Sequence, residues 1–157
     1  MTVTIRKGIL EDLPQVYNLI KELALFERAP QEVTNTIEDM ERDGFGENHI
    51  FSFFVAEKAD QLIGIALYYT AYSTWKGKTI YLEDLIVTES QRRTGVGRKL
   101  FDAVASEAKA VGAKRFAWQV LEWNEPAIAF YKQIGATLDS EWINCRMTEE
   151  QIQQYSA

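Results

Sequence analysis

The sequence contains few of the residues that bind metals or cross-link a chain. Among its 157 residues there is one cysteine, Cys145, and one histidine, His49. A single cysteine cannot close an intramolecular disulfide, and a single histidine cannot assemble a multi-histidine metal site. We therefore expect no disulfide and no metal cofactor, and we interpret both residues as structural.

Long apolar runs and a secretory signal are also missing. No apolar stretch approaches the roughly 20 residues that a membrane-spanning helix needs. The N-terminal MTVTIRKGILEDLPQV has no basic segment followed by an apolar segment and a small-residue cleavage site. Hydrophobic residues make up 46% and charged residues 25%, as in ordinary globular proteins. We expect a cytoplasmic protein with no membrane partner, folded as a single domain over residues 1–157.

Positive charge is in short supply. The chain has 17 lysines and arginines against 23 aspartates and glutamates, which gives a net charge of -6 at pH 7. Such a chain repels the phosphate backbone of nucleic acids, so we expect no nucleic-acid partner. A cationic partner suits this charge better.

Apolar periodicity predicts an α/β protein in which a mixed sheet packs against helices. Residues 2–7 alternate as a half-buried strand does, and the next run places Leu13, Val16, Ile20 and Leu23 on one helical face. The expected elements are strand 2–7, helices 11–26 and 36–44, strands 50–57, 61–72 and 78–89, helix 96–111, strand 114–123, helix 125–135, strand 137–147 and a short helix after Thr148.

The stretch QRRTGVGRKL, residues 91–100, carries the strongest functional signal. Gly95 and Gly97 let the backbone approach a ligand closely, and the helix that starts here directs free N–H groups toward it. An anion such as phosphate fits, while a tight turn with solvated arginines is the alternative. A P-loop needs GK followed by Ser or Thr, and the dinucleotide fingerprint needs a glycine at Leu100, so a nucleoside triphosphate or NAD fits poorly.

Arg92, Gly95 and Gly97 match the R-x-x-G-x-G/A turn of the GNAT superfamily of N-acetyltransferases, which the chain resembles. The blocks LIKELALFE, DGFGE, WKGKTIYLEDLIV and EWNEPAIAFYKQIGA are similar to segments of its spermidine/spermine (diamine) and thialysine acetyltransferases, in the same order. The loop around Lys58 to Gln61 is shorter than in the polyamine enzymes, and residues 141–157 differ from their tail.

The resemblance implies a GNAT-type sheet, mixed and mostly antiparallel, flanked by helices. It also implies acetyl transfer from acetyl-coenzyme A, used as cosubstrate without a metal, to a primary amine of a small di- or polyamine. Transfer would be direct, within a ternary complex, and the protein would be a homodimer.

Two alternatives stay open. One is a thialysine or other small amino-acid acceptor, whose carboxylate would need a cation such as Lys76 or Lys78. The other is an acyl-coenzyme A sensor without turnover, against which Glu83 and Tyr131 argue.

The resemblance assigns two catalytic residues. Glu83 would attract the substrate ammonium and accept its proton, directly or through water. Tyr131 would protonate the departing thiolate, since a phenol with a pKa of about 10 is protonated at neutral pH. An exposed edge carboxylate and a packing tyrosine are the plain alternatives. Asp84 should face the opposite side of the sheet from Glu83, because successive strand residues alternate.

The remaining assigned residues bind the cofactor or the acceptor. The resemblance implies that the cofactor is bound by Leu85, Ile86, Val87, Arg92, Arg93, Thr94, Gly95, Val96, Gly97, Arg98, Asn124, Glu125, Pro126 and Ala127. It implies that the acceptor is bound by Phe26, Glu27, Glu32, Trp75, Glu83, Ala117, Trp118 and Gln119. Carboxylates and aromatic faces suit a polycation, although Phe26 stands where the polyamine enzyme has a tyrosine.

Overall fold

The computed structural model describes residues 1–156, in two compact units that divide between Gln119 and Val120. The elements of the first unit are β1 (Thr4–Lys7), α1 (Leu13–Phe26), α2 (Ile37–Phe45), β2 (Ser52–Lys58), β3 (Gln61–Ser73), β4 (Gly77–Val87), α3 (Val96–Ala110) and β5 (Arg115–Trp118). Single-turn 3₁₀-helices occupy Leu10–Asp12 (η1), Pro30–Glu32 (η2) and Glu89–Gln91 (η3).

The five strands form one sheet in the order β1-β2-β3-β4-β5. The first three pairings are antiparallel, and β4 pairs with β5 in parallel. The connection between these two parallel strands runs through α3, as a parallel pairing requires. The predicted α/β fold with a mixed, mostly antiparallel sheet is therefore confirmed.

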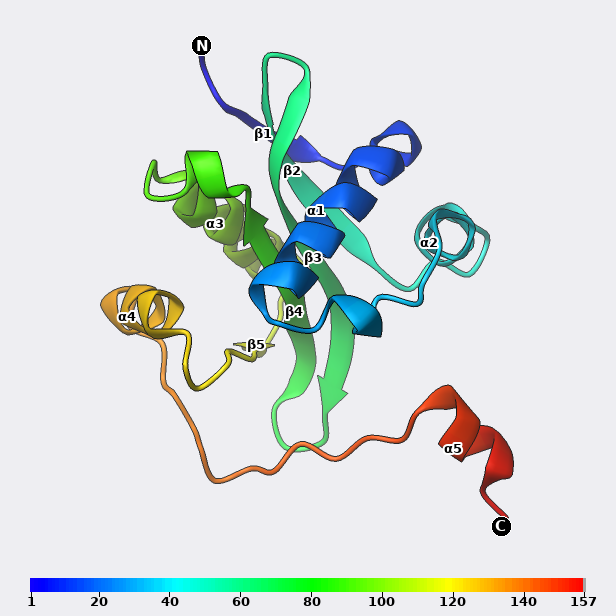
Figure 1. The fold of residues 1–157 in the computed structure, drawn as a ribbon. Coiled ribbons are helices and arrows are strands. Elements are labelled where there is room, and N and C mark those ends of the chain that lie inside the picture. The colour runs from blue at the N-terminus through cyan, green and yellow to red at the C-terminus, as the bar shows by residue number, and fades with distance from the viewer. Residues whose placement is uncertain (157) are drawn as a thin grey trace. The chain divides into compact units, whose positions relative to one another are not determined.

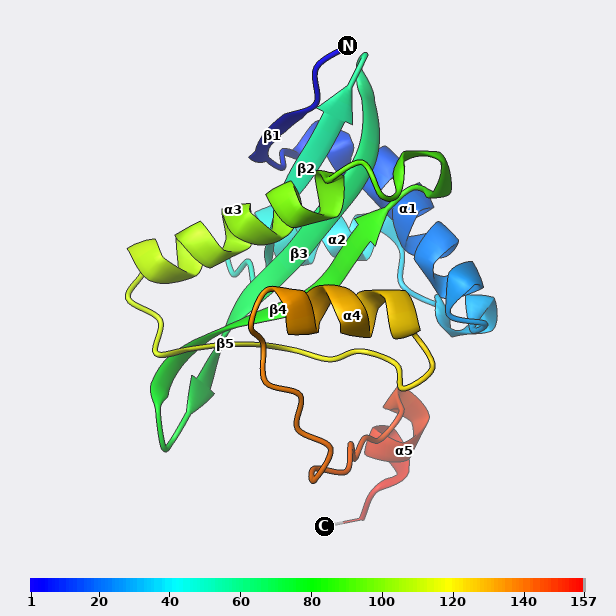
Figure 2. The ribbon, with the colours of Figure 1, turned by 90° about the vertical axis from the view of Figure 1, so that its left-hand side faces the viewer.

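Helices cover both faces of this sheet, with α1 and α2 on one face and α3 on the other (Figures 1 and 2). On the first face, Leu13 and Val16 of α1 pack in one cluster with Val55 and Ile65 of the sheet. On the other face, α3 approaches at Gly64, where an added Cβ would lie 3.0 Å from Leu100 Cδ1 and 2.7 Å from a backbone oxygen. This glycine permits the close contact between α3 and the sheet.

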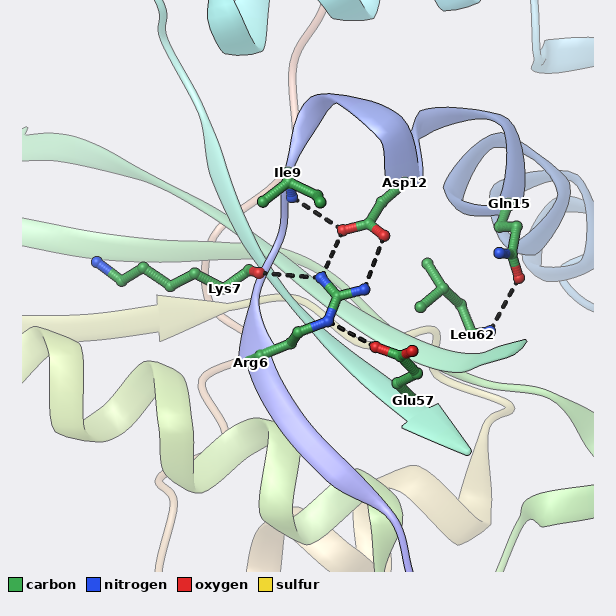
Figure 3. Close-up of polar contacts among 7 residues, drawn as sticks. All are labelled: Arg6, Lys7, Ile9, Asp12, Gln15, Glu57 and Leu62. Carbon is green, nitrogen blue, oxygen red and sulfur yellow. Dashed lines mark hydrogen bonds and ion pairs between the residues drawn. The ribbon is translucent and has the colours of Figure 1, made fainter. Parts of the chain in front are cut away.

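A polar cluster attaches the start of α1 to the sheet (Figure 3). The Arg6 guanidinium donates to Glu57 at 2.6 Å and to both oxygens of Asp12 at 2.8 and 2.9 Å. Asp12 also accepts the N–H of Ile9 at 2.8 Å. Burial opposes ionisation of Asp12, but the hydrogen bonds from Arg6 and Ile9 outweigh it and lower the pKa of this carboxyl. The cluster fixes where α1 enters the face on which the candidate site lies.

The second unit contains α4 (Glu125–Gln133) and α5 (Glu149–Gln154). Asn124 caps α4 by accepting the Ala127 N–H at 3.4 Å, and Thr148 forms the predicted capping box with Gln151 at the start of α5. Within residues 1–156, no helix is both long and apolar enough to cross a membrane.

The predicted strand at 137–147 is wrong. This stretch has no regular structure, and Trp142 and Ile143 are 74% and 88% exposed. Asp139 instead makes local bonds, accepting the Glu141 N–H at 2.9 Å and the Trp142 indole N–H at 3.0 Å. Such a side-chain turn competes with a strand ladder. The strand predicted at 114–123 is also shorter, since β5 ends at Trp118.

Candidate active site

The centre of the candidate site is a β-bulge in β4. Leu67 of β3 pairs with Asp84, whereas the next residue, Tyr68, pairs with Leu82, so Glu83 is inserted between two paired positions. A bulge breaks the alternation of side chains along its strand. Asp84 therefore shares the face of its partner Leu67, which belongs to the core cluster beneath α1.

The same face carries Glu83. The hydroxyl of Tyr69, which lies two residues beyond Leu67 and hence on the same face, donates to Glu83 Oε2 at 3.1 Å. The expectation that Asp84 faces away from Glu83 is thus wrong, because the inserted residue resets the alternation. Two adjacent carboxylates are presented toward the end of α1.

A third carboxylate, Glu27, joins this pair from the C-terminal end of α1. Burial, followed by the charges of Glu83 and Glu27, raises the pKa of Asp84 to about 7. Burial alone raises the pKa of Glu27. Burial and neighbouring negative charges both disfavour ionisation of a carboxyl group, and a bound cation offsets these two effects. The group of Glu27, Glu83 and Asp84, the acidic cluster, is therefore suited to an ammonium.

Two tyrosines stand beside the acidic cluster. Tyr69 and Tyr81 are cross-strand partners whose ring centroids lie 5.3 Å apart. Burial first, and then the charge of Glu83, raises the pKa of Tyr69 to about 12, and the same causes raise the pKa of Tyr81. Both phenols stay protonated at neutral pH, so each can donate a hydrogen bond. Tyr69, Tyr81 and Asp84 were not predicted as site residues. A tyrosine on each of the two runs that form the β3–β4 hairpin could have indicated the first two.

The sheet opens beside this cluster. β5 pairs with β4 only as far as Leu82, which is opposite Trp118. In the part of the chain that the structure describes, residues 83–87 of β4 have no strand on that side. Their backbone groups, including those of Leu85, Ile86 and Val87, form an edge along which an extended ligand can hydrogen-bond. The side chain of Ile86 is buried, so any ligand contact there would be through the backbone.

Beyond the end of β4, the glycine turn forms the start of α3. Gly95 is the N-cap with a left-handed φ of 86°, and the first helical bond runs from the Lys99 N–H to the Gly95 carbonyl at 3.1 Å. The N–H groups of Val96, Gly97 and Arg98 precede that bond and cannot bond within the helix. An added Cβ on Gly97 would lie 3.6 Å from Val87 Cγ2, which places this N-terminus next to the open strand.

The arginines of the turn lie differently. Arg93 and Arg98 are exposed, and Arg98 pairs with Asp102 at 2.9 Å. Thr94, also exposed, donates to the Gln91 carbonyl at 2.6 Å. The Arg92 side chain is 35% exposed and packs on α1, with its guanidinium carbon 4.8 Å from the Phe26 ring centroid. The free N–H groups and exposed guanidinium groups together fit a pyrophosphate.

The other predicted acceptor residues lie at separate places. Glu32 in η2 and Trp75 in the β3–β4 turn are exposed, the tryptophan by 84%. Trp118 packs its ring 5.1 Å from that of Phe101 of α3, with Ala117 beside it and Gln119 exposed after the strand. Among residues 1–156, neither Glu32 nor Trp75 forms a hydrogen bond or an ion pair with the acidic cluster.

The second unit carries the predicted general acid on α4. The first turn of this helix contains Glu125, Pro126 and Ala127 after the cap Asn124. Tyr131 is 8% exposed and its ring centroid lies 5.4 Å from that of Phe130. Burial raises the pKa of Tyr131 to about 12, so the phenol is protonated at neutral pH and is able to donate a proton.

Comparison with known proteins decides the family. Residues 13–136, which include parts of both units, match the acetyltransferase (GNAT) family. The chain belongs to this family. Its members use acetyl-coenzyme A as cosubstrate, and this GNAT protein is accordingly an acetyltransferase.

Within this family, two curated relatives are similar to the chain in sequence. The chain is 35% identical to thialysine N-epsilon-acetyltransferase of Mus musculus, over 96% of this chain and 95% of that protein. It is 34% identical to spermidine/spermine N(1)-acetyltransferase-like protein 1 of Homo sapiens, over 94% of this chain but only 23% of that protein. The predicted resemblance to the thialysine and spermidine/spermine enzymes is confirmed.

Solved structures share the fold of this GNAT protein. An integron cassette protein from the mobile metagenome of V. cholerae aligns with a TM-score of 0.79 at 24% identity, over 98% of this chain and 96% of that one. The aminoglycoside N-acetyltransferase AAC(6')-Iy in complex with coenzyme A aligns with a TM-score of 0.75 at 20% identity, over 93% and 95% of the two chains.

Proposed function

We propose that this GNAT enzyme transfers the acetyl group of acetyl-coenzyme A to a primary amine of a small acceptor that carries at least two ammonium groups, as spermidine and related polyamines do. The observation that carries the proposal is the acidic cluster of Glu27, Glu83 and Asp84, in which Asp84 has a pKa of about 7. Carboxylates that repel one another are stabilised by a bound cation, and a cation with several charges stabilises them most.

The chain's residues divide the chemistry between them. Acetyl-coenzyme A, when bound, supplies an activated acetyl thioester. The acceptor amine has a solution pKa of about 10.4, so it must lose a proton before it attacks. Glu83, oriented by the Tyr69 hydroxyl at 3.1 Å, receives that proton directly or through water. Tyr131 donates its phenolic proton to the sulfur that leaves.

The cofactor residues follow from the open strand and the glycine turn. The N–H groups of Val96, Gly97 and Arg98 would bind the pyrophosphate, with Arg93 nearby. The backbone of residues 85–87 would bind the pantetheine arm. The family resemblance alone adds Asn124, Glu125, Pro126 and Ala127 as further cofactor residues. The donor set supports this assignment, since N–H groups at a helix start and exposed guanidinium groups are what an anion requires.

A second acceptor class has its own support. The relatives named for thialysine are 35–38% identical to this chain, and a plant relative is named for L-ornithine. Thialysine carries two ammonium groups and a carboxylate, which would need a cation in the site. Lys78 is engaged elsewhere, because its Nζ donates to the Val111 carbonyl at 3.0 Å. Lys76, exposed in the β3–β4 turn, is the remaining candidate of the two.

Release of coenzyme A, measured with spermidine, spermine, putrescine, thialysine and lysine, tests the proposal. We expect kcat/KM to be highest for a polyamine, and Glu27→Gln to lower it for spermidine by about tenfold while a simple monoamine changes much less. Glu47→Gln, which removes an exposed charge after α2, is the control. Thialysine as the best substrate by a wide margin, with sensitivity to Lys76→Met, would favour the second class instead.

We also propose that the enzyme is a homodimer, on the strength of the family resemblance alone, and that it resides in the cytoplasm. Light scattering on the purified protein tests the dimer, and a purely monomeric particle at micromolar concentration would contradict it. Fractionation of the source cells tests the compartment.

A further inference from the structure

Glu22 is a half-buried carboxylate of α1 that has no part in the proposed chemistry. It lies one turn before the end of the helix, on the side that meets the segment after β4. Its carboxylate accepts the Thr88 hydroxyl at 3.0 and 3.1 Å and the Glu89 backbone N–H at 2.9 Å. These partners are 66 and 67 residues away in sequence, so the contact exists only in the folded protein.

The bond to Glu89 makes Glu22 the cap of the short helix η3. A helix start leaves N–H groups without partners, and the residue before it commonly supplies a side-chain oxygen. Thr88 precedes η3 but makes no such bond. Instead, its hydroxyl donates to Glu22, and the Glu22 carboxylate accepts the Glu89 N–H at the start of η3.

The same carboxylate also reaches the other end of η3. Arg92, which follows it, has its guanidinium 4.0 Å from Glu22 and donates through Nε to the Val87 carbonyl at 3.0 Å. The ring of Phe26, one turn beyond Glu22 on α1, packs against this guanidinium at 4.8 Å. Glu22 therefore contacts both ends of the segment from Thr88 to Arg92, and Arg92 fastens that segment to the end of β4.

This segment leads directly into the cofactor turn. Arg93 and Gly95 adopt left-handed φ values of 62° and 86°, and α3 starts at the next residue. Any displacement of the segment therefore moves the N–H groups at the start of α3. Anion binding by such groups depends on their direction, which is why the residues that orient a binding group affect affinity without touching the ligand.

We propose that Glu22 is a positioning residue for cofactor binding: it clamps Thr88–Arg92 to α1 so that the start of α3 points at the pyrophosphate. The inference rests on the proposed cofactor role of the α3 N-terminus. It differs from a purely stabilising cap, which would change the free energy of unfolding and leave the affinity for coenzyme A unaltered. It also differs from an acceptor contact, which would change the KM of the amine.

Binding of coenzyme A alone, measured by calorimetry, tests the proposal without any acceptor or turnover. Glu22→Ala removes every contact, and we expect it to weaken coenzyme A about tenfold. Glu22→Gln keeps one oxygen for the Glu89 N–H, and we expect about a threefold loss. At saturating acetyl-coenzyme A, kcat and the amine KM should stay within about twofold of wild type. Glu47→Gln again controls for the lost charge.

A double-mutant cycle with Thr88→Val sharpens the test. If the two side chains act through one contact, Thr88→Val should weaken coenzyme A in the wild-type background and add little to Glu22→Ala. Should Glu22→Ala not fold, Glu22→Gln and Thr88→Val carry the same expectation.

Three outcomes would overturn the inference. Folded Glu22→Ala that binds coenzyme A within twofold of wild type, yet exchanges its Glu89 amide faster, makes Glu22 a stabilising cap only. A rise in the amine KM equal to the loss in coenzyme A affinity places Glu22 in the acceptor site. Wild-type protein that does not bind coenzyme A at all would contradict the proposed function itself. The first two outcomes, by contrast, would contradict only the role of Glu22.

Discussion

Replacing Asp84 by asparagine should stabilise the protein and impair the enzyme at the same time. The carboxyl lies at the bulge of β4, where burial and the charges of Glu83 and Glu27 raise its pKa to about 7. Asparagine has nearly the same shape and no charge. The change therefore removes an electrostatic strain from the free protein and a binding group from the acceptor site.

The pH dependence fixes the sign of the effect on stability. The folded protein keeps the Asp84 proton up to about pH 7, whereas an unfolded chain loses it near 3.8. Between these values the native state binds more protons than the unfolded state, so this group's contribution to stability falls as pH rises. At 1.36 kcal/mol for each pKa unit, the ceiling is about 4 kcal/mol. Partial solvent exposure screens the charges, so we expect Asp84→Asn to gain about 1–2 kcal/mol at pH 8 and roughly a third of that at pH 5.

Urea unfolding of wild type and Asp84→Asn at half-unit steps from pH 5 to pH 8.5 measures this difference. Glu47→Gln serves as the matched control and should show no such trend. Acetylation of spermidine is measured on the same samples, and we expect kcat/KM to fall by at least about tenfold. A stability difference that stays constant from pH 5 to pH 8.5, or an asparagine variant that is less stable at pH 8, would refute the reasoning.

Three further predictions concern other parts of the chain. Gly97→Asp should keep its fold, since the added Cβ meets Val87 Cγ2 at an ordinary 3.6 Å, but should weaken coenzyme A by at least about tenfold in calorimetry because a carboxylate enters the anion site; unchanged affinity contradicts the site. Tyr131→Phe should lower kcat about a hundredfold with little change in melting temperature, and a rate within about threefold of wild type would make Tyr131 a packing residue. Ala59→Asn with Asp60→Gly should raise the free energy of unfolding by about 1 kcal/mol. Both residues have left-handed φ values, 54° and 61°, which asparagine and glycine adopt more readily. If urea unfolding shows no gain, the backbone of this turn is not strained.

Elements with local signals could be predicted from the sequence. The helical spacing of Val96, Leu100 and Val104 identified α3, and all three side chains are buried. The caps at Asn124 and Thr148 were visible because a cap depends only on the next few residues. A polar stretch between two β-rich runs sufficed for the β2–β3 hairpin.

Features that depend on a partner elsewhere in the chain could not be predicted in this way. The bulge at Glu83 arises from the pairing of β4 with β3, so nothing in residues 78–89 shows that Asp84 changes face. The position of Arg92 is set by Glu22 and Phe26 of a distant helix. The strand predicted at 137–147 was wrong for the opposite reason. Alternating apolar residues allow a segment to pair with a sheet but do not require it, and here the side chain of Asp139 forms local hydrogen bonds instead.

The open edge of β4 also bears on the colloidal behaviour of the protein. A strand with an unpaired row of N–H and C=O groups can recruit the edge of another chain, and charged side chains along it oppose such association. Exposed Glu83 and its neighbour Asp84 stand on this strand, so the residues proposed to attract the substrate also repel a second strand of the same charge. Neutralising both should therefore promote aggregation even while the fold itself becomes more stable.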